Sequence, residues 1–475
     1  MTDPDSGPPE PVLLDAYDGR HGVTGDVGAD YAAWTTRRPR MPNGRQLAPR
    51  PVDERDPTDP AVGWGLVLPM LPGGDGAAQA AADDAPEPLR RLLAHRRGRV
   101  LRYRTREVDA DDKLYDPLAG RDIELVSPKT GSAPGQLPKY LLIYGPPTAV
   151  AWQLQFNLNT VRCVGRLDLD DDGLARYVDA ALTDWAGSAA DYRSPVVWSV
   201  DHGGGVDADM TTLMRRTVAL PLKNAFAVDS DMTGLLYLDG SKSPALLDGL
   251  TTALLERRPA LVVTTSHGLT APLDDLAALR TMLGTPVDQR FQPLDPAGAV
   301  AQWQPDGAVW FAQACCSAGS NGPSVYQGLF PLAGDVGSVL FGVAALGPQT
   351  SPLPRSLLGR DRPLRAFVGR VEPTFSWTLR GELTEAAVTD DLVQCVYQHL
   401  CDGEPVGMAM QHFFTPISRL LQRYQRSNDR HGQTVGAASV AAARSALYNK
   451  VSAFDRAGLV ILGDPAVAIP RPTPV

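Results

Sequence analysis

The sequence predicts an α/β protein in which helices cover both faces of a mostly parallel central sheet, preceded by an irregular N-terminal accessory region. From residue 138 onward, short runs of β-branched and aromatic residues alternate with segments of helical spacing, as in parallel strands joined by crossover helices. Residues 1–60 are instead rich in Pro, Asp, Gly and Arg, with little periodicity. Hydrophobic residues make up 43% of the chain, which permits a sizeable core. We expect an accessory region over 1–135 and a folded domain over 136–470.

The hydrophobic pattern predicts one strand and one helix within the accessory region. A short apolar run at 63–69 predicts a strand, and leucines at helical spacing predict a helix over 77–97. Residues 105–138 return to loop composition. We expect this region to wrap on, or hinge against, the folded domain.

The folded domain is predicted from alternating strand and helix patterns. Strands are expected at 140–144, 196–200, 261–266, 308–314, 365–371 and 459–462. Helices are expected at 174–185, 211–226, 244–257, 273–283, 406–427 and 436–454. This alternation indicates a largely parallel sheet whose strands are buried on both faces.

Charge and cysteine usage narrow the class of protein. A net charge of −9 gives no reason to expect nucleic acid or an anionic membrane as a partner. The first residues are acidic and polar, unlike a secretory signal, and the apolar run at 336–346 is too short to span a bilayer. The odd number of cysteines, 5, without a Cys-x-x-Cys spacing, favours reduced thiols in a cytoplasm.

The most informative residues follow two of the predicted strands. Leu-Val-Val-Thr-Thr-Ser leads into His267, and Val-Trp-Phe-Ala-Gln-Ala leads into Cys315. If the two strands are parallel neighbours, both side chains emerge at the carboxyl edge of the sheet, where the sites of open α/β sheets form. Neighbouring strands lie about 4.8 Å apart, so thiol and imidazole come within reach of each other. The sequence therefore predicts a His267–Cys315 dyad for covalent acyl transfer.

Small residues after each side chain favour a reaction centre. Gly268 lets a substrate backbone approach, and the amides of Gly268 and Cys315 are expected to hold the oxyanion. Two alternatives stay open. Strand alternation puts Cys315 and Cys316 on opposite faces, and we favour Cys315 as the nucleophile. His202 also follows a predicted strand, but a further strand–helix unit separates it from the cysteines, so we favour His267 as the base.

These motifs resemble the caspase–gingipain clan of cysteine peptidases, which includes the CHAT-domain proteases. Gln-Ala-Cys at 313–315 follows a hydrophobic strand, and Ser-His-Gly at 266–268 lies about 50 residues upstream. Other pieces are similar to the gingipain-like branch in the same order, namely the runs at 140–147, 164–177 and 462–465. The resemblance spans 138–466 and implies a caspase-like α/β/α sandwich, a His/Cys dyad and endopeptidase activity.

The resemblance also implies substrate-binding residues. Gln313 stands two residues before the nucleophile, as in caspases, and gingipain-like enzymes place an acid near the start of the helix after the second core strand. Here that segment contains Asp207 and Asp209, either of which would favour a basic residue at P1. The alternative is that the aspartate caps the following helix.

Metal sites are not predicted. The 7 histidines include no pair at the spacing of a helical zinc motif, and no dinucleotide or Walker loop is present. The run Asp168–Gly173 has the spacing of a calcium loop, with Asp179 at its last position, but a strand precedes it, so an acidic helix start is the better interpretation. The Arg- and Pro-rich run at 351–363 is predicted to be a solvated linker, with activation cleavage as its alternative.

The leading prediction is a bacterial-type, cytoplasmic cysteine endopeptidase without a cofactor. Its expected partners are a protein or peptide substrate and a regulatory protein. One alternative is a catalytically inactive interaction or regulatory module with the same fold. Another is an acyl-transfer enzyme that is not a peptidase.

Overall fold

The computed structural model describes residues 52–71, 73, 76–104, 110–205, 209–332, 334–381 and 387–469. It also gives the backbone of β1 (Val12–Tyr17) and β2 (Gly22–Gly25), which pair antiparallel. The chain divides into two units, Met1–Pro51 and Val52–Val475. Every residue discussed below belongs to the larger unit. Asp207 lies outside the described residues.

One sheet organises the larger unit, and 12 strands of the described residues belong to it. From one edge to the other, the strands are β10 (Leu236–Asp239), β9 (Val196–Ser199), β11 (Leu261–Thr265), β14 (Val309–Gln313), β17 (Ala366–Arg370), β18 (Leu459–Leu462), β8 (Cys163–Leu167), β7 (Tyr140–Tyr144), β3 (Trp64–Pro69), β4 (Arg99–Tyr103), β5 (Lys113–Asp116) and β6 (Arg121–Glu124). The first five run parallel, β18 is antiparallel to β17, and the next strands as far as β4 run parallel to β18. The α/β class with a mostly parallel sheet is therefore confirmed.

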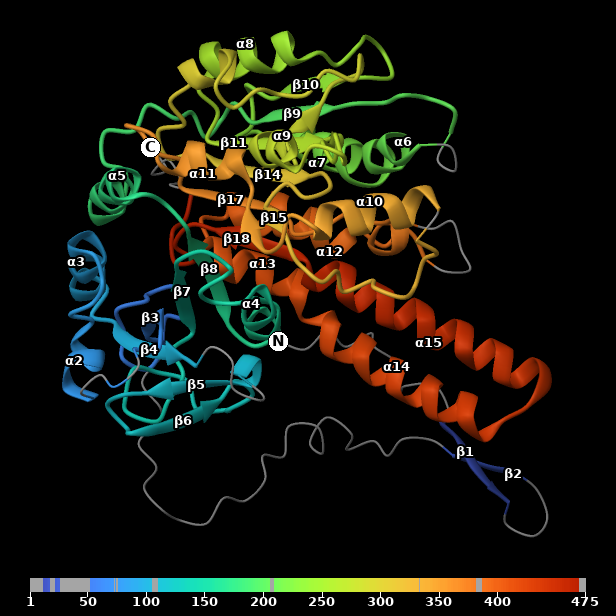
Figure 1. Ribbon diagram of the computed structural model, residues 1–475. Coiled ribbons are helices and arrows are strands. Elements are labelled where there is room, and N and C mark those ends of the chain that lie inside the picture. The colour runs from blue at the N-terminus through green and yellow to red at the C-terminus, as the bar shows by residue number, and fades with distance from the viewer. Residues whose placement is uncertain are drawn as a thin grey trace, which may run out of the picture. The chain divides into compact units, whose positions relative to one another are not determined.

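Both faces of this sheet are buried, since every residue of β11, β14, β17 and β18 is buried, and alternate residues of β7 enter different apolar clusters. On β7, Tyr140 and Leu142 belong to one cluster, whereas Leu141 and Ile143 belong to another. The covering helices lie on both sides of the sheet (Figure 1). The α-helices of the described residues are α2 (Gly76–Ala81), α3 (Glu87–His95), α4 (Trp152–Asn159), α5 (Asp171–Leu182), α6 (Met210–Met214), α7 (Leu220–Val228), α8 (Leu247–Arg257), α9 (Leu276–Met282), α10 (Asp335–Ala344), α11 (Pro352–Leu358), α12 (Asp390–Gln394), α13 (Val406–Phe414), α14 (Pro416–Gln433) and α15 (Gly436–Ala457). The last two form a long pair that extends away from the sheet (Figure 1).

The boundary expected near residue 135 differs from the one observed. β3, β4, β5 and β6 extend the central sheet beyond β7, and the compact unit begins at Val52. β3 pairs with β7 over Trp64–Val67, so the run at 63–69 is a central strand rather than part of an accessory region. The loop-like composition of 105–138 concealed this continuity, because β5 and β6 are only four residues long.

Two other expected elements differ in detail. The predicted linker at 351–363 contains α11, whose Leu353, Leu357 and Leu358 are buried. Proline in the first turn of a helix costs little, so the Pro-rich start is compatible with this helix. The helix expected over 406–427 is broken at Thr415, where α13 ends and α14 begins with Pro416. Within the described part of the chain, no helix is both long and apolar enough to cross a bilayer.

The acidic run at 168–173 starts a helix. The Asp170 carboxylate accepts a hydrogen bond from the Gly173 amide at 2.7 Å and so caps α5. Asp179 faces α3, where its carboxylate pairs with Arg91 at 2.8 Å. Both carboxylates are therefore engaged within the chain, in agreement with the interpretation of this run as an acidic helix start.

Candidate active site

The two predicted active-site residues follow neighbouring strands. β11 and β14 are parallel, and Thr265 lies directly opposite Gln313. His267 and Cys315 each come two residues later along their chains. The strands form because all five residues of each are buried, and Trp310 of β14 donates its indole N–H to Thr264 of β11 at 3.0 Å. The two residues therefore emerge at the same edge of the sheet, as predicted.

Backbone packing fixes how closely the two segments approach. His267 and Gly268 form β12, a two-residue strand paired antiparallel with β13 (Pro286–Val287). A methyl group on Gly268 would overlap the Cys315 carbonyl oxygen and lie 3.0 Å from the Cys315 nitrogen. Glycine is required at this position because the two backbones touch.

The imidazole of His267 is held by Asp209. Its Nε2 lies 3.0 Å from Oδ2 of Asp209, and the ring is 36% exposed. Asp209 is the N-cap of α6, since its Oδ1 accepts the Thr211 amide at 2.7 Å. Burial by itself would raise the pKa of the Asp209 carboxyl, but hydrogen bonds from Thr211 and His267 outweigh it and hold that pKa below its ordinary value. An ionised Asp209 favours Nε2–H on His267, which leaves Nδ1 free to accept a proton.

His202, the alternative base, packs behind His267 and makes no hydrogen bond to Cys315. The two imidazole rings stack with centroids 5.4 Å apart, and His202 stacks on Phe291 at 4.2 Å. Nδ1 of His202 lies 3.8 Å from Oδ1 of Asp209. Asp209 therefore lies between two histidines, a grouping that the linear spacing of 202, 209 and 267 did not reveal.

The thiol of Cys315 forms hydrogen bonds with the segment that follows β17. Sγ accepts the Thr374 amide at 3.3 Å and lies 3.7 Å from the Thr374 carbonyl oxygen. Burial raises the pKa of this thiol. Within the part of the chain that the structure describes, no hydrogen bond joins Sγ of Cys315 to His267.

The neighbouring cysteine has a different environment. Cys316 is fully buried in a small apolar cluster with Leu279, Leu283 and Val343. Burial raises its thiol pKa well above the ordinary value. Its backbone φ of +55° places a turn directly after Cys315. Of the two cysteines, Cys316 is the fully buried one, whereas Cys315 is partly exposed and bonds Thr374.

The two amides expected to bind an oxyanion differ in how they are placed. Leu269 donates its amide to Thr285 across the β12–β13 ribbon, so the preceding amide, that of Gly268, points away from β13. The Cys315 amide donates to no main-chain oxygen among the described residues, whereas the next amide bonds the Glu372 carbonyl oxygen at 3.0 Å. Gly268 itself is buried, and the oxyanion role of the two amides stays a prediction.

Gln313, expected to contact substrate, lies beneath the site instead. It is fully buried, and its Oε1 lies 3.4 Å from Nη2 of Arg370 on β17. Among the described residues, its Nε2 has no hydrogen-bond partner. Asp455 of α15 continues this network, because its carboxylate accepts the hydroxyls of Thr374 at 2.7 Å and Thr378 at 2.6 Å. Gln313 is therefore linked to the loop that holds the thiol.

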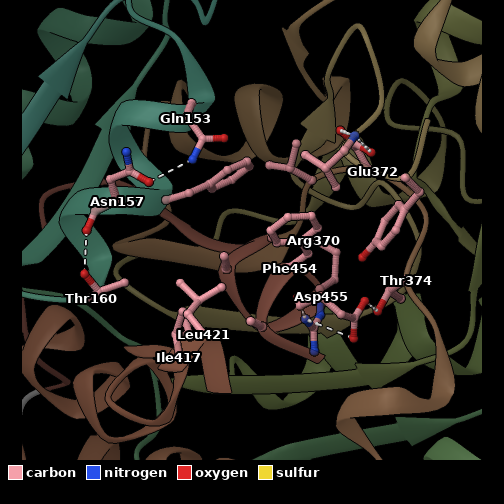
Figure 2. A pocket seen from close by; sticks show the side chains of 17 residues that line it. Gln153, Asn157, Thr160, Arg370, Glu372, Thr374, Ile417, Leu421, Phe454 and Asp455 are labelled. Atoms are coloured by element: carbon pink, nitrogen blue, oxygen red, sulfur yellow. Dashed lines mark hydrogen bonds and ion pairs between the residues drawn. The ribbon is translucent and has the colours of Figure 1, made fainter. Parts of the chain in front are cut away.

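A cavity of about 200 Å³ adjoins this loop (Figure 2). Phe156 of α4, Leu421 of α14 and Phe454 of α15 form apolar walls, and Arg370 and Asp455 lie beside Thr374. Sequence reasoning missed these residues because they come from four elements far apart in the chain. Arg370 and Thr374 could have been noticed, since they lie at the end of a predicted strand.

The chain was compared with protein-family models, curated proteins and solved structures, and it matches none of them significantly. The resemblance to caspase–gingipain peptidases stays a prediction carried by its own motifs.

Proposed function

We propose that the chain is a caspase/gingipain-like cysteine endopeptidase with His267 as base and Cys315 as nucleophile. The observation that carries this proposal is the contact between Gly268 and the Cys315 backbone, which fixes the two segments side by side. The Asp209 hydrogen bond supports it, since it orients the imidazole and leaves Nδ1 free.

The reaction begins with the neutral thiol. As Sγ of Cys315 attacks the scissile carbonyl carbon, the thiol proton passes to Nδ1 of His267. The amides of Gly268 and Cys315 hold the oxyanion. The C–N bond then breaks as Nδ1 returns the proton to the leaving amine, and a thioester forms. Water attacks the thioester as its proton passes to Nδ1. The C–S bond then breaks, and Nδ1 returns the proton to Sγ, which releases the acid and restores the thiol.

The neutral thiol is consistent with the raised pKa of Cys315. Because the contacts of Sγ are to Thr374, the thiol must turn from them to reach His267. We infer that substrate binding along the Thr374 segment supplies this change.

Asp209 is one of the two aspartates that were expected to bind a basic P1 side chain, and its own contacts do not favour that role. Both oxygens of Asp209 are already engaged, by Thr211 and by His267. The proposal therefore commits to peptide-bond hydrolysis in a protein or peptide substrate, not to a P1 residue. We propose a cytoplasmic location because all five cysteines are free thiols. A regulatory protein would act in the same compartment.

The test is labelling by a peptidyl electrophile, read by mass spectrometry of the intact protein. We expect one label, on Cys315, that disappears in Cys315→Ala and in His267→Ala. Cys316→Ala is the matched control, because it removes the adjacent thiol and should keep the label. A label lost in His202→Ala but kept in His267→Ala would overturn the assignment of the base.

A second candidate function is an inactive module of the same fold. The absence of a hydrogen bond between Cys315 and His267 favours it. A folded protein that takes no label and cleaves no member of a peptide library would support this candidate over the peptidase.

A further inference from the structure

Two histidines and one aspartate beside the candidate dyad could hold a metal ion. The ligand atoms of His202, Asp209 and His267 all lie within 4.8 Å of one another. They come from the loop after β9, the start of α6 and β12, the short strand that follows β11. We propose that these three side chains bind a divalent transition-metal ion, with Zn²⁺ as the best match, and that the bound ion switches His267 out of its catalytic role.

The donor geometry is close to that of a zinc site. Zinc binds nitrogen and oxygen at about 2.0–2.2 Å, so two donors on a tetrahedral ion lie roughly 3.3 Å apart. Nε2 of His267 is 3.0 Å from one Asp209 oxygen, and Nδ1 of His202 is 3.8 Å from the other. Each of these two Asp209–histidine donor pairs therefore lies within about 0.5 Å of the spacing on a tetrahedral ion.

The surroundings of His202 fit a metal ligand. Its other ring nitrogen, Nε2, lies 3.4 Å from the Asp288 carbonyl oxygen. A ligating histidine usually donates its second N–H to such a carbonyl, which fixes the tautomer and leaves Nδ1 for the ion. Stacking on Phe291 holds the ring, whose side chain is only 8% exposed.

Donor chemistry selects the ion. Two imidazoles and one carboxylate suit zinc and its neighbours in the first transition row, whereas calcium and magnesium prefer oxygen donors. The ring of His267 is 36% exposed, so an ion can enter from solvent and keep water in its fourth position.

The consequence for catalysis follows from the tautomers of His267 and rests on the proposed function. Without metal, Nε2–H faces Asp209 and Nδ1 accepts the thiol proton. When Nε2 binds the ion, a neutral imidazole carries its proton on Nδ1 instead. Nδ1 can then no longer accept a proton from Cys315, so the ion inhibits the enzyme without touching the thiol.

The experiment uses the full chain with His412→Ala as background. That substitution weakens a second group of potential ligands, formed by His399, Glu404 and His412. Binding is followed by calorimetry with Zn²⁺ and by the visible absorption of Co²⁺. We expect one equivalent of either ion and at least tenfold weaker binding in His202→Ala. His202→Phe keeps the stacking on Phe291 without a ligand nitrogen, so it should show the same loss.

Cys315→Ala decides whether the thiol takes part. Because the proposed ligands exclude sulfur, this variant should bind zinc as tightly as its background, and the Co²⁺ complex should lack a thiolate charge-transfer band. Binding lost in Cys315→Ala, binding unchanged in His202→Phe, or no binding at millimolar metal would each overturn the proposal.

Inhibition is measured separately from binding. Zinc should slow electrophile labelling of Cys315, and His202→Phe should need at least tenfold more zinc for the same fractional slowing relative to its own zinc-free rate. If no variant is labelled at all, the peptidase proposal fails while the binding data still decide the metal site. Equal sensitivity of the two proteins to zinc would contradict the switch.

Discussion

Replacing Gly268 by alanine tests the contact on which the active-site proposal depends. The added methyl group would overlap the carbonyl oxygen of Cys315 and lie 2.9 Å from its carbonyl carbon and 3.0 Å from its nitrogen. All three atoms belong to the backbone, so no change of rotamer relieves the overlap. The segment that carries Cys315 must move away from His267.

The size of the effect follows from the distances. Ordinary contacts between carbon atoms lie at about 3.5–4.0 Å, so the two backbones must separate by roughly 1 Å or more. Overpacking of this kind costs about 1–3 kcal/mol of stability. A 1 Å misplacement of reacting groups lowers a rate by about 100-fold. We therefore expect Gly268→Ala to lower the rate of Cys315 labelling about 100-fold.

The assay is the second-order rate of labelling by a peptidyl electrophile, with urea unfolding measured in parallel. Gly249→Ala is the matched control, because Gly249 lies in α8 and the nearest atom to its added methyl group is 3.9 Å away. That variant should label at the wild-type rate and gain about 0.5–1 kcal/mol of stability. Wild-type labelling in Gly268→Ala, with unchanged stability, would refute the reasoning.

Three further predictions concern side chains. Asp209→Asn should slow labelling about 10–30-fold, because a charge-assisted hydrogen bond worth about 1.5–2 kcal/mol is lost; the unfolding free energy should barely change, since asparagine also caps helices, and unaltered labelling would rule out a positioning role. Arg166 is buried, its pKa is lowered by burial to about 9, and it donates to the Gly145 and Val150 carbonyl oxygens at 2.9 Å. Arg166→Ala should therefore cost about 3 kcal/mol in urea unfolding, and a loss below about 1 kcal/mol would mean that water replaces the guanidinium. The Arg102 hydrogen bond lowers the pKa of Asp84, so this pair stabilises the fold above the unfolded pKa of about 3.9 and loses that effect as pH falls through the folded value. Asp84→Asn should be about 1–2 kcal/mol less stable than wild type at pH 7, and the difference should shrink at acid pH; a difference independent of pH would contradict this.

Strand periodicity carried the prediction of the sheet because buried parallel strands are continuous apolar runs. β11 and β14 were expected as neighbours and pair residue by residue from Leu261 to Thr265. β5 and β6 were missed since four-residue strands in a Pro- and Gly-rich segment leave no such run. The same limit hid α11, whose buried Leu353 and Leu357 are separated in the sequence by Pro354, Arg355 and Ser356.

Some residues of the candidate site were likewise predictable from the sequence, and others were not. His267, Cys315 and Gly268 were predictable because they follow two recognisable strands, and the geometry of a parallel sheet brings such ends together. The role of Asp209 was not, since a lone aspartate before a helix has the same local pattern whether it caps, binds substrate or orients a histidine. Gln313 was expected to contact substrate because it stands two residues before the proposed nucleophile. It is instead buried in the core.

The sequence by itself determined the α/β class, the neighbouring strands β11 and β14, and the placing of His267 and Cys315 after the same edge of the sheet. These features are local, because strand formation and the position of a residue after a strand depend on a few adjacent side chains. Only the tertiary structure decided that Asp209 lies between His202 and His267, and that Thr374 holds the Cys315 thiol. Those contacts join residues more than 50 positions apart or different elements, and they depend on how helices and loops pack above the sheet.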